Sequence, residues 1–277
     1  MPNSIYFGGT LTDPLGSSMV YLGGPSYGLT VLLDDIDALA SVMVDMQDVP
    51  YGFGGASWGT HHPSKRFLIP CVVRGTSFSD TKSKLDALNL VLDKNRLCAL
   101  RFDDWNDRYW MVRYAGHGPV TLRQMGATFD LEFIAPDPRA YSVDETTQTI
   151  NISGTTAFTV PASGVLAGTA EPDVVWLLKP TGSGATSPVV ISNETRDEIV
   201  TWQNALTTAQ WLRVTATARQ EIVERTGDSG ATYTPVNSSL LSGSRFPKLS
   251  PNVANDCELS GFASTGTLTV TYRARYN

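Results

Sequence analysis

The sequence is poor in the residues that build metal sites, disulfide frameworks and catalytic centres. It has three cysteines and three histidines in 277 residues, and Cys71, Cys98 and Cys257 lie far apart with no second cysteine or histidine at ligand spacing. A disulfide scaffold needs an even set of cysteines, and a structural zinc site needs closely spaced ligands. We therefore expect no metal, no cofactor and no disulfide, in a chain made in a reducing cytoplasm.

Long apolar runs and an excess of basic residues are also missing. No run approaches the roughly 20 apolar residues that span a bilayer, and the N-terminus lacks the pattern of a cleaved signal. The chain has 21 Lys and Arg against 27 Asp and Glu, which gives a formal charge of −6. Because binding to nucleic acid depends on neutralising phosphates, we expect no specific nucleic-acid binding and no membrane insertion.

Signatures of enzymes are absent as well. His61, His62 and His117 stand among glycines or turn residues, outside any Gly-x-Ser-x-Gly or His-Glu-x-x-His motif. The aspartates at 34–37 and at 103–107 lack the spacing of a calcium loop, so we interpret them as solvated charge in turns. We expect no catalytic residues and no enzymatic activity.

The composition that is present favours β-structure. Apolar residues make up 42% of the chain, and 24 glycines and 16 prolines interrupt it often. A length of 277 residues suits two domains of ordinary size. Two prolines within 135–141 prevent continued strand pairing, so we place an N-terminal domain at 1–141 and a C-terminal domain at 142–277.

The N-terminal half predicts a sheet with one amphipathic helix. A helix is expected over 79–95, where Leu88 lies on an apolar stripe, with Ser77 or Ser79 as its N-cap. Alternation over 128–134 predicts a strand with one buried face. Further strands are expected at 67–74, 97–102 and 108–114, the first with Pro70 at an edge or a bulge and the last two forming a hairpin.

The C-terminal half predicts a β-sandwich of short strands. The clearest strand is 268–276, in which we expect Arg273 and Arg275 to lie on the solvated face. The other strands are expected at 174–178, 189–192, 198–202, 211–216 and 219–224. Trp176, Trp202 and Trp211 are either a platform on which a sugar ring stacks or ordinary core residues, and core is the more common role of tryptophan.

The order of these elements resembles that of the distal tail proteins of long-tailed, non-contractile bacteriophages. One departure is Asn252-Val253-Ala254-Asn255, where the family has Pro-Gly-x-Asn, so a turn glycine is missing. The resemblance spans nearly the whole chain and is carried by short segments in a fixed order: Asp48–Gly52, the helix and the hairpin after it, Phe129–Phe133, Asp137–Tyr141, Asn193–Arg196, Glu198–Val200, Phe246–Pro251 with Asn255, and Leu268–Tyr276.

The resemblance implies a mainly β protein of two domains. It predicts an N-terminal β-sheet or sandwich domain with one amphipathic helix and a protruding arm, and a galectin-like C-terminal sandwich. It also predicts a homo-oligomeric ring, a hexamer, that joins the tail tube to the tail-tip hub, fibre or receptor-binding proteins. The protein would be a virion component of the tail tip, assembled in the host cytoplasm. The alternative is a lectin-like protein that binds carbohydrate during host-surface recognition.

The glycine-rich segment between Pro50 and Pro63 is the predicted arm. It is aromatic but has no periodic core face, so we expect a loose loop that packs on a neighbouring subunit. Large aromatic side chains tend to dominate interface energetics. The candidate subunit-interface residues are Tyr51, Phe53, Trp58 and His61.

Overall fold

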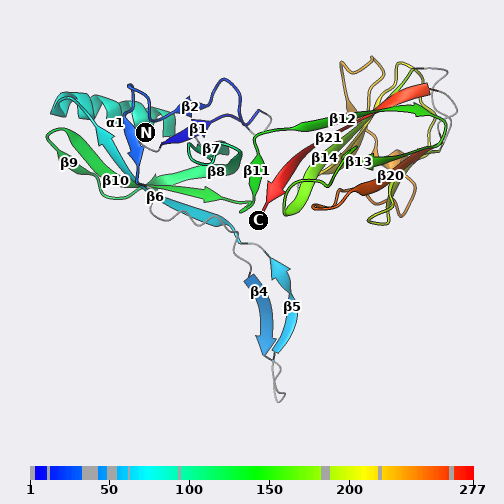
Figure 1. The fold of residues 1–277 in the computed structure, drawn as a ribbon, viewed down its shortest axis with the longest axis horizontal. Helices are drawn as coiled ribbons and strands as arrows, with labels where there is room; N and C mark the ends of the chain where they lie inside the picture. The colour runs from blue at the N-terminus through cyan, green and yellow to red at the C-terminus, as the bar shows by residue number, and fades with distance from the viewer. Residues whose placement is uncertain are drawn as a thin grey trace. The chain divides into compact units, whose positions relative to one another are not determined.

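The chain divides into two compact units in the computed structural model (Figure 1). Unit 1 comprises residues 1–143 with Asn277, and unit 2 comprises residues 144–276; the sequence placed this division after Tyr141. The structure describes residues 4–10, 13–32, 43–48, 55–61, 63–92, 95–181, 188–217, 220–261 and 265–277, and it gives only the backbone for 43–48 and 55–61.

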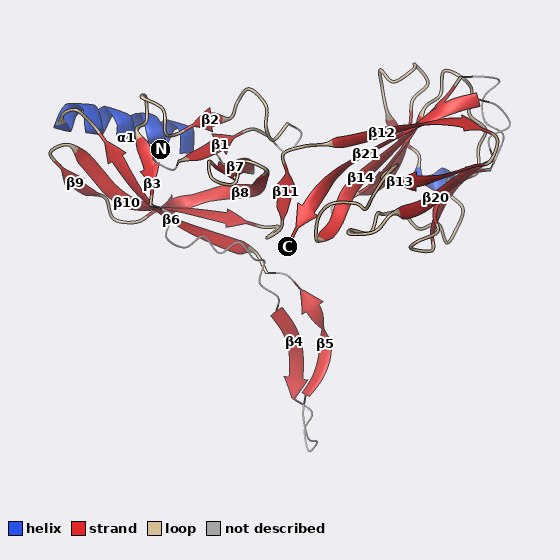
Figure 2. Cartoon of the chain, viewed as in Figure 1, coloured by secondary structure: helices blue, strands red, loops and turns tan. Residues whose placement is uncertain are grey.

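Strands dominate the described residues, and α1 is the single α-helix among them (Figure 2). This confirms the prediction of a mainly β fold with one helix. In unit 1 the strands run in the order β2-β1-β7-β8 and then β8-β10-β6-β3, with β9 on β10 and β11 on β8. The elements are β1 Ile5–Gly8, β2 Val20–Tyr21, β3 Leu29–Val31, β4 Met43–Asp48, β5 Gly55–His61, β6 Lys65–Arg74, α1 Phe78–Leu92, β7 Cys98–Phe102, β8 Arg108–His117, β9 Thr121–Arg123, β10 Gly126–Ala135 and β11 Ala140–Ser142.

The core of unit 1 lies between α1 and one face of β6 and β10. Both strands alternate buried and exposed side chains, and their inward residues include Cys71, Phe129 and Leu131. Leu88 and Leu92 of α1 are buried beside these strands. The predicted helix stripe and the predicted alternation at 128–134 are therefore confirmed.

The N-terminus of α1 is capped by Ser77. The Asp80 amide donates a 3.1 Å hydrogen bond to Ser77 Oγ, while the Asp80 carboxylate accepts hydrogen bonds from the Thr76 amide at 2.7 Å and from the Thr76 hydroxyl at 3.1 Å. The Thr76 amide and Lys84 hold the pKa of the Asp80 carboxyl below its ordinary value. Of the two caps that the sequence allowed, the structure uses Ser77.

The predicted hairpin is present as β7 and β8, which pair from Cys98 opposite Val112 to Leu100 opposite Trp110. Pro70 lies inside β6, which pairs with β10 along its whole length. On the other side β3 pairs only with residues 71–73, and the Pro70 carbonyl accepts a hydrogen bond from the Leu32 amide just past the end of β3. Pro70 is therefore at a local edge, where its missing N–H interrupts no ladder among the described strands.

Unit 2 is a sandwich of two antiparallel sheets. One sheet has the order β19-β18-β17-β14-β21 with β12 on β21, and the other has the order β13-β20-β15-β16. The elements are β12 Thr146–Ser153, β13 Thr156–Val160, β14 Ala170–Pro180, β15 Val189–Asn193, β16 Glu198–Trp202, β17 Leu212–Ala216, β18 Glu221–Arg225, β19 Thr234–Pro235, the 3-10 helix η1 Asn237–Ser239, β20 Asn255–Ser260 and β21 Thr265–Tyr276.

Side chains from both sheets fill the core of unit 2. Trp176 and Val270 come from one sheet and Ile191 and Leu259 from the other, and all four are at most 1% exposed. Alternation along β21 confirms its buried face. The prediction that Arg275 is solvated is wrong: it is buried, because Asp173 lies 3.5 Å from its guanidinium and the Glu171 carbonyl accepts a hydrogen bond from it.

Candidate functional site

The described part of the predicted arm, residues 55–61, is one strand of a β-hairpin. Strands β4 and β5 pair from Met43 opposite His61 to Asp48 opposite Gly55. The expectation of a loose loop is therefore wrong for residues 55–61, because the preceding segment supplies a partner strand that the sequence did not reveal. Among the described strands, β4 and β5 pair only with each other.

Two of the four predicted interface residues lie in this hairpin. The pairing shifts so that Asp45 is opposite Gly59 and Met46 is opposite Ser57, which leaves Trp58 as the extra residue of a β-bulge. His61 is the last residue of β5, and Tyr51 and Phe53 lie outside the described residues.

The hairpin is a candidate assembly element because two strands alone form too small a sheet to be stable without further packing. An isolated two-stranded hairpin is marginally stable in water, since it has no third strand and no packed layer to bury its apolar side chains. A bulge commonly re-aims a side chain at functional positions. A neighbouring surface would provide the missing packing.

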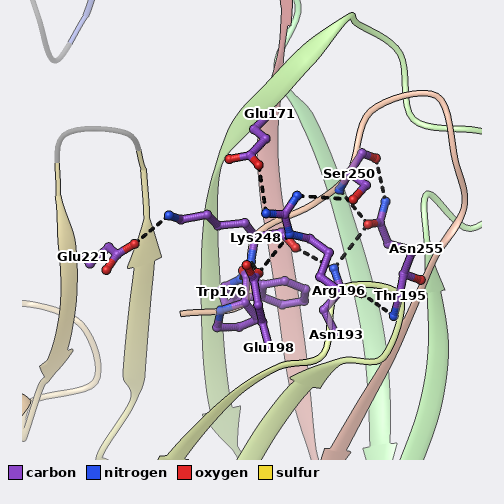
Figure 3. A network of polar contacts seen from close by, with 11 residues as sticks. Glu171, Trp176, Asn193, Thr195, Arg196, Glu198, Glu221, Lys248, Ser250 and Asn255 are labelled. Atoms are coloured by element: carbon purple, nitrogen blue, oxygen red, sulfur yellow. Dashed lines mark hydrogen bonds and ion pairs between the residues drawn. The ribbon is translucent and has the colours of Figure 1, made fainter. Parts of the chain in front are cut away.

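Unit 2 contains a polar network that gathers several of the segments carrying the family resemblance (Figure 3). Its centre is Arg196, in the turn between β15 and β16. The guanidinium of Arg196 donates to Glu171 Oε1 at 2.8 Å and to Ser250 Oγ at 3.3 Å, and its Nε lies 3.1 Å from Glu198 Oε2. Burial alone would lower the pKa of Arg196, but the carboxylates of Glu171 and Glu198 raise it above its ordinary value.

Two buried asparagines hold the segment 246–251 against this centre. Asn193 Nδ2 donates to the Lys248 carbonyl at 2.5 Å and to Asn255 Oδ1 at 3.2 Å. Asn255 Nδ2 in turn donates to the carbonyls of Ser250 at 3.0 Å and Val160 at 3.3 Å. Asn193 and Asn255 end β15 and begin β20, so the strands fix the positions of both amides.

Further bonds fix the same segment along its length. Trp176 Nε1 donates to the Pro247 carbonyl at 2.9 Å, and the Lys248 amide donates to Glu198 Oε2 at 2.7 Å. The Lys248 ammonium lies 2.7 Å from Glu221 Oε1. Since these groups are bonded to one another, the network fixes an irregular segment on the sandwich and has the chemistry of a structural clamp. Glu171 and Glu221 were not predicted, because nothing in the sequence links them to their partners far along the chain.

The structure does not support a sugar platform of tryptophans. Trp176 and Trp202 are buried in the core, at 0% and 2% exposure. The ring of Trp211 already has two neighbours: the Lys179 ammonium lies 4.3 Å from its centroid, and Gly230 approaches so closely that a Cβ there would lie 2.4 Å from a ring carbon.

The remaining chemistry-bearing residues also have structural surroundings. Cys71, Cys98 and Cys257 are buried thiols without disulfides, and burial raises the pKa of Cys71 and of Cys257 to about 12. Asp107 pairs with Arg108 at 2.9 Å, and the aspartates at 34, 35 and 37, like His62, lie outside the described residues. Among the residues described, no group of three His, Cys, Asp or Glu could hold a metal, and no helix is long and apolar enough to cross a membrane.

Comparison with protein-family models and with curated protein sequences gives no match. Comparison with solved structures gives matches over the full chain. The Dit protein of phage SPP1, described as a paradigm of the hub adsorption apparatus in phages that infect Gram-positive bacteria, matches with a TM-score of 0.74 at 15% identity over 100% of both chains. A chain of the phage P2 baseplate in its activated conformation with calcium matches with a TM-score of 0.51 at 8% identity over 98% of both chains.

These matches agree with the resemblance inferred from the order of the sequence segments. The agreement concerns the fold, because identities of 15% and 8% are too low to carry more. The chain has the fold of a phage distal tail protein.

Proposed function

We propose that this chain is a structural protein of a phage virion that forms a ring of six copies at the distal end of the tail tube. The ring joins the tube to the hub, fibre or receptor-binding proteins of the tail tip, and it does so without enzymatic activity. In this proposal unit 2 is a galectin-like sandwich that faces the tail-tip proteins, and the chain is assembled in the host cytoplasm.

The observation that carries this proposal is the match to SPP1 Dit over the whole of both chains. A match to one domain alone would say nothing about the fold of the other half of the chain. Here both units and their order along the chain match a protein described as a hub component, and the second match is a baseplate chain.

The hairpin gives the proposal a physical basis. A ring needs one surface of each subunit to contact a different surface of the next, and protruding strands are a common means of making such heterologous contacts. Within the described residues β4 and β5 lack any third strand. Tyr51, Phe53, Trp58 and His61 are the proposed contact residues of this arm.

The lectin-like alternative loses its main support in the tryptophans. Two of the three rings that it requires are core residues, and the third is occupied by neighbours within unit 2. The irregular segment at 246–251 is held by main-chain and side-chain bonds, which suits a rigid support for partner proteins.

Negative-stain microscopy of the purified chain tests the proposal. We expect top views with sixfold symmetry and, in purified phage, gold-labelled antibody against the chain at the tail tip. Labelling along the tail or on the capsid would contradict the proposed position, and the absence of closed particles at every concentration would contradict the ring.

A further inference from the structure

Strand β8 contains a bulge that changes which of its side chains face α1. Its pairing with β10 shifts between Glu132 and Phe133, so the three steps from Tyr114 to His117 match only two steps along β10. Residues three apart on a regular strand point to opposite faces, but the bulge turns both rings inward. Tyr114 packs on Phe133 with 5.7 Å between ring centroids. His117 packs on Phe129 at 6.4 Å.

These two rings form one wall of a groove along α1. The groove has a volume of about 750 Å³ and is lined by Asp86, Asn89 and Leu90 of α1 and by Tyr114, Gly116 and His117 of β8. A smaller cavity of about 70 Å³, which we call the socket, shares Asn89, Tyr114 and His117 with the groove. The other residues that line the socket are apolar: Leu85, Leu88, Leu92, Val120, Phe129 and Leu131. The socket therefore adjoins the groove and is its apolar part.

The groove offers hydrogen-bond acceptors beside the socket. His117 Nδ1 lies 2.8 Å from the Gly118 carbonyl. Because a carbonyl only accepts, Nδ1 carries the proton and Nε2 of the neutral ring is an acceptor. Asp86 is exposed and makes no ion pair with another described residue. The described residues that line the groove and the socket include no lysine or arginine, so this surface favours a cation over an anion.

The dimensions of the socket favour a single side chain as its occupant. Pockets for small molecules have volumes of roughly 300–1,000 Å³ and enclose most of the ligand. The socket has only about 70 Å³, and the groove beside it is open. Leu90, which is 81% exposed, extends the apolar contact along the groove. An extended protein segment can place one apolar side chain in the socket while its neighbours lie in the groove.

We propose that the socket and the groove bind a segment of a partner protein in which an apolar residue is followed by lysine or arginine. The apolar side chain enters the socket, and the cation lies beside Asp86 and Nε2 of His117. Burial of the apolar group supplies the driving force, and the charge selects the segment. The site is formed by α1, β8, β10 and residues 118–120 of one chain. It therefore goes beyond the proposed ring and does not depend on it.

A methyl NMR titration of the full chain with short peptides tests the proposal. The probes are Gly-Leu-Lys-Gly, Gly-Leu-Glu-Gly and Gly-Ser-Lys-Gly, each with acetyl and amide caps. We expect Gly-Leu-Lys-Gly to shift the methyl signals of Leu85, Leu88 and Leu131. The other two should bind roughly 10-fold more weakly, because one brings a like charge to Asp86 and the other lacks the apolar side chain. Equal binding of the three peptides, or unmoved socket methyls, would overturn the proposal.

A substitution that fills the socket tests the apolar contact. Val120 lines the socket and is 38% exposed, so Val120→Phe adds volume there at a position open to solvent. We expect this variant to lose the methyl shifts caused by Gly-Leu-Lys-Gly. Leu122→Phe is the matched control, because Leu122 is 50% exposed on β9 and does not line the socket. Unchanged binding by Val120→Phe would overturn the proposal.

A change of charge on the surface of α1 tests the selection of the cation. We expect Asp86→Lys to reverse the preference, so that Gly-Leu-Glu-Gly binds more tightly than Gly-Leu-Lys-Gly. Asp104→Lys makes the same change of charge at an exposed turn position away from the groove and should leave the preference unaltered. The same preference in Asp86→Lys as in the wild type would overturn the proposed selection.

Assembly of the variants separates this proposal from the proposed function. We expect Val120→Phe and Asp86→Lys to form the ring as the wild type does, measured by native mass spectrometry. Loss of the ring in both variants would make the groove a contact between copies and overturn the partner proposed here. A wild-type chain that binds Gly-Leu-Lys-Gly selectively and stays monomeric would overturn the ring and support the site.

Discussion

The side chain of Asn255 forms a closed pair of hydrogen bonds with the backbone of Ser250: its Oδ1 accepts from the Ser250 amide at 2.7 Å, and its Nδ2 donates to the Ser250 carbonyl at 3.0 Å. Asn255 is fully buried, at 0% exposure. One amide side chain therefore replaces the strand partner that this irregular segment lacks.

Replacing Asn255 with alanine should destabilise unit 2. Each buried backbone group left unpaired costs about 1–3 kcal/mol, and the Ser250 amide and the Val160 carbonyl would both lose a partner. Chemical denaturation followed by tryptophan fluorescence measures the loss. Asn151→Ala, at an exposed position of β12, is the control and should stay within about 0.5 kcal/mol of the wild type. Equal effects of the two substitutions would mean that Asn255 is not a clamp.

In the turn before Asn255 the residue in the left-handed conformation is Asn252, with φ of 59°, whereas Val253, where the family has glycine, does not have a positive φ. Asparagine tolerates this region better than other residues with a Cβ, whereas alanine does not. We expect Asn252→Ala to cost about 1 kcal/mol and Asn252→Gly to cost nothing. Thermal unfolding of the three proteins checks the order, and an alanine variant as stable as the glycine variant would exclude backbone strain at this turn.

Leu88 should contribute to the core of unit 1, and Leu90 should not. Leu88 is 2% exposed, whereas Leu90 is 81% exposed two residues along the same helix. Leu88→Ala should lower the free energy of unfolding by about 2–5 kcal/mol because it leaves a cavity. Leu90→Ala makes the same change in helix propensity as Leu88→Ala. It should change the free energy of unfolding by less than about 0.5 kcal/mol. Similar losses from both would show that the helix face is assigned incorrectly.

Asp228 should make the stability of the folded protein depend on pH in the acidic range. Hydrogen bonds from the Thr226 hydroxyl and the Thr232 amide lower the pKa of its carboxyl from 3.8 to about 2. Because the folded pKa is depressed, the stabilisation is complete above the unfolded pKa and is lost as the pH falls toward the folded value.

The melting temperatures of the wild type and of Asp228→Asn should therefore differ most above pH 4 and converge near pH 2. Asp104→Asn, at an exposed turn position, serves as the comparison for a simple change of net charge. A difference that stays constant from pH 6 to pH 2 would assign the effect of Asp228 to packing instead of ionisation.

Local periodicity predicted the elements whose faces differ in polarity. The helix α1 and strands β6, β10 and β21 each have a buried side and an exposed side, and these patterns are present in the residues themselves. Strand β12, with the sequence TTQTINIS, has little apolar pattern and was missed. It is held by its ladder with β21, more than a hundred residues away, which no local pattern reveals.

The polar network, too, could be predicted only in part from the sequence. The segments containing Arg196, Lys248 and Asn255 were recognised, but their convergence depends on loops brought together by the sandwich. Arg275 follows the alternation of a solvated residue and is nevertheless buried, because Asp173 on the neighbouring strand neutralises it. Such pairs are long-range properties of the fold.

The proposed ring is tested most directly by native mass spectrometry of the wild-type chain and of a chain whose residues 33–62 are replaced by a linker, at equal concentration. We predict a closed hexamer for the wild type and a monomer for the chain with the linker, with unchanged melting of the subunit core. A monomeric wild type, or an arm-replaced chain that still forms the wild-type hexamer, would contradict it.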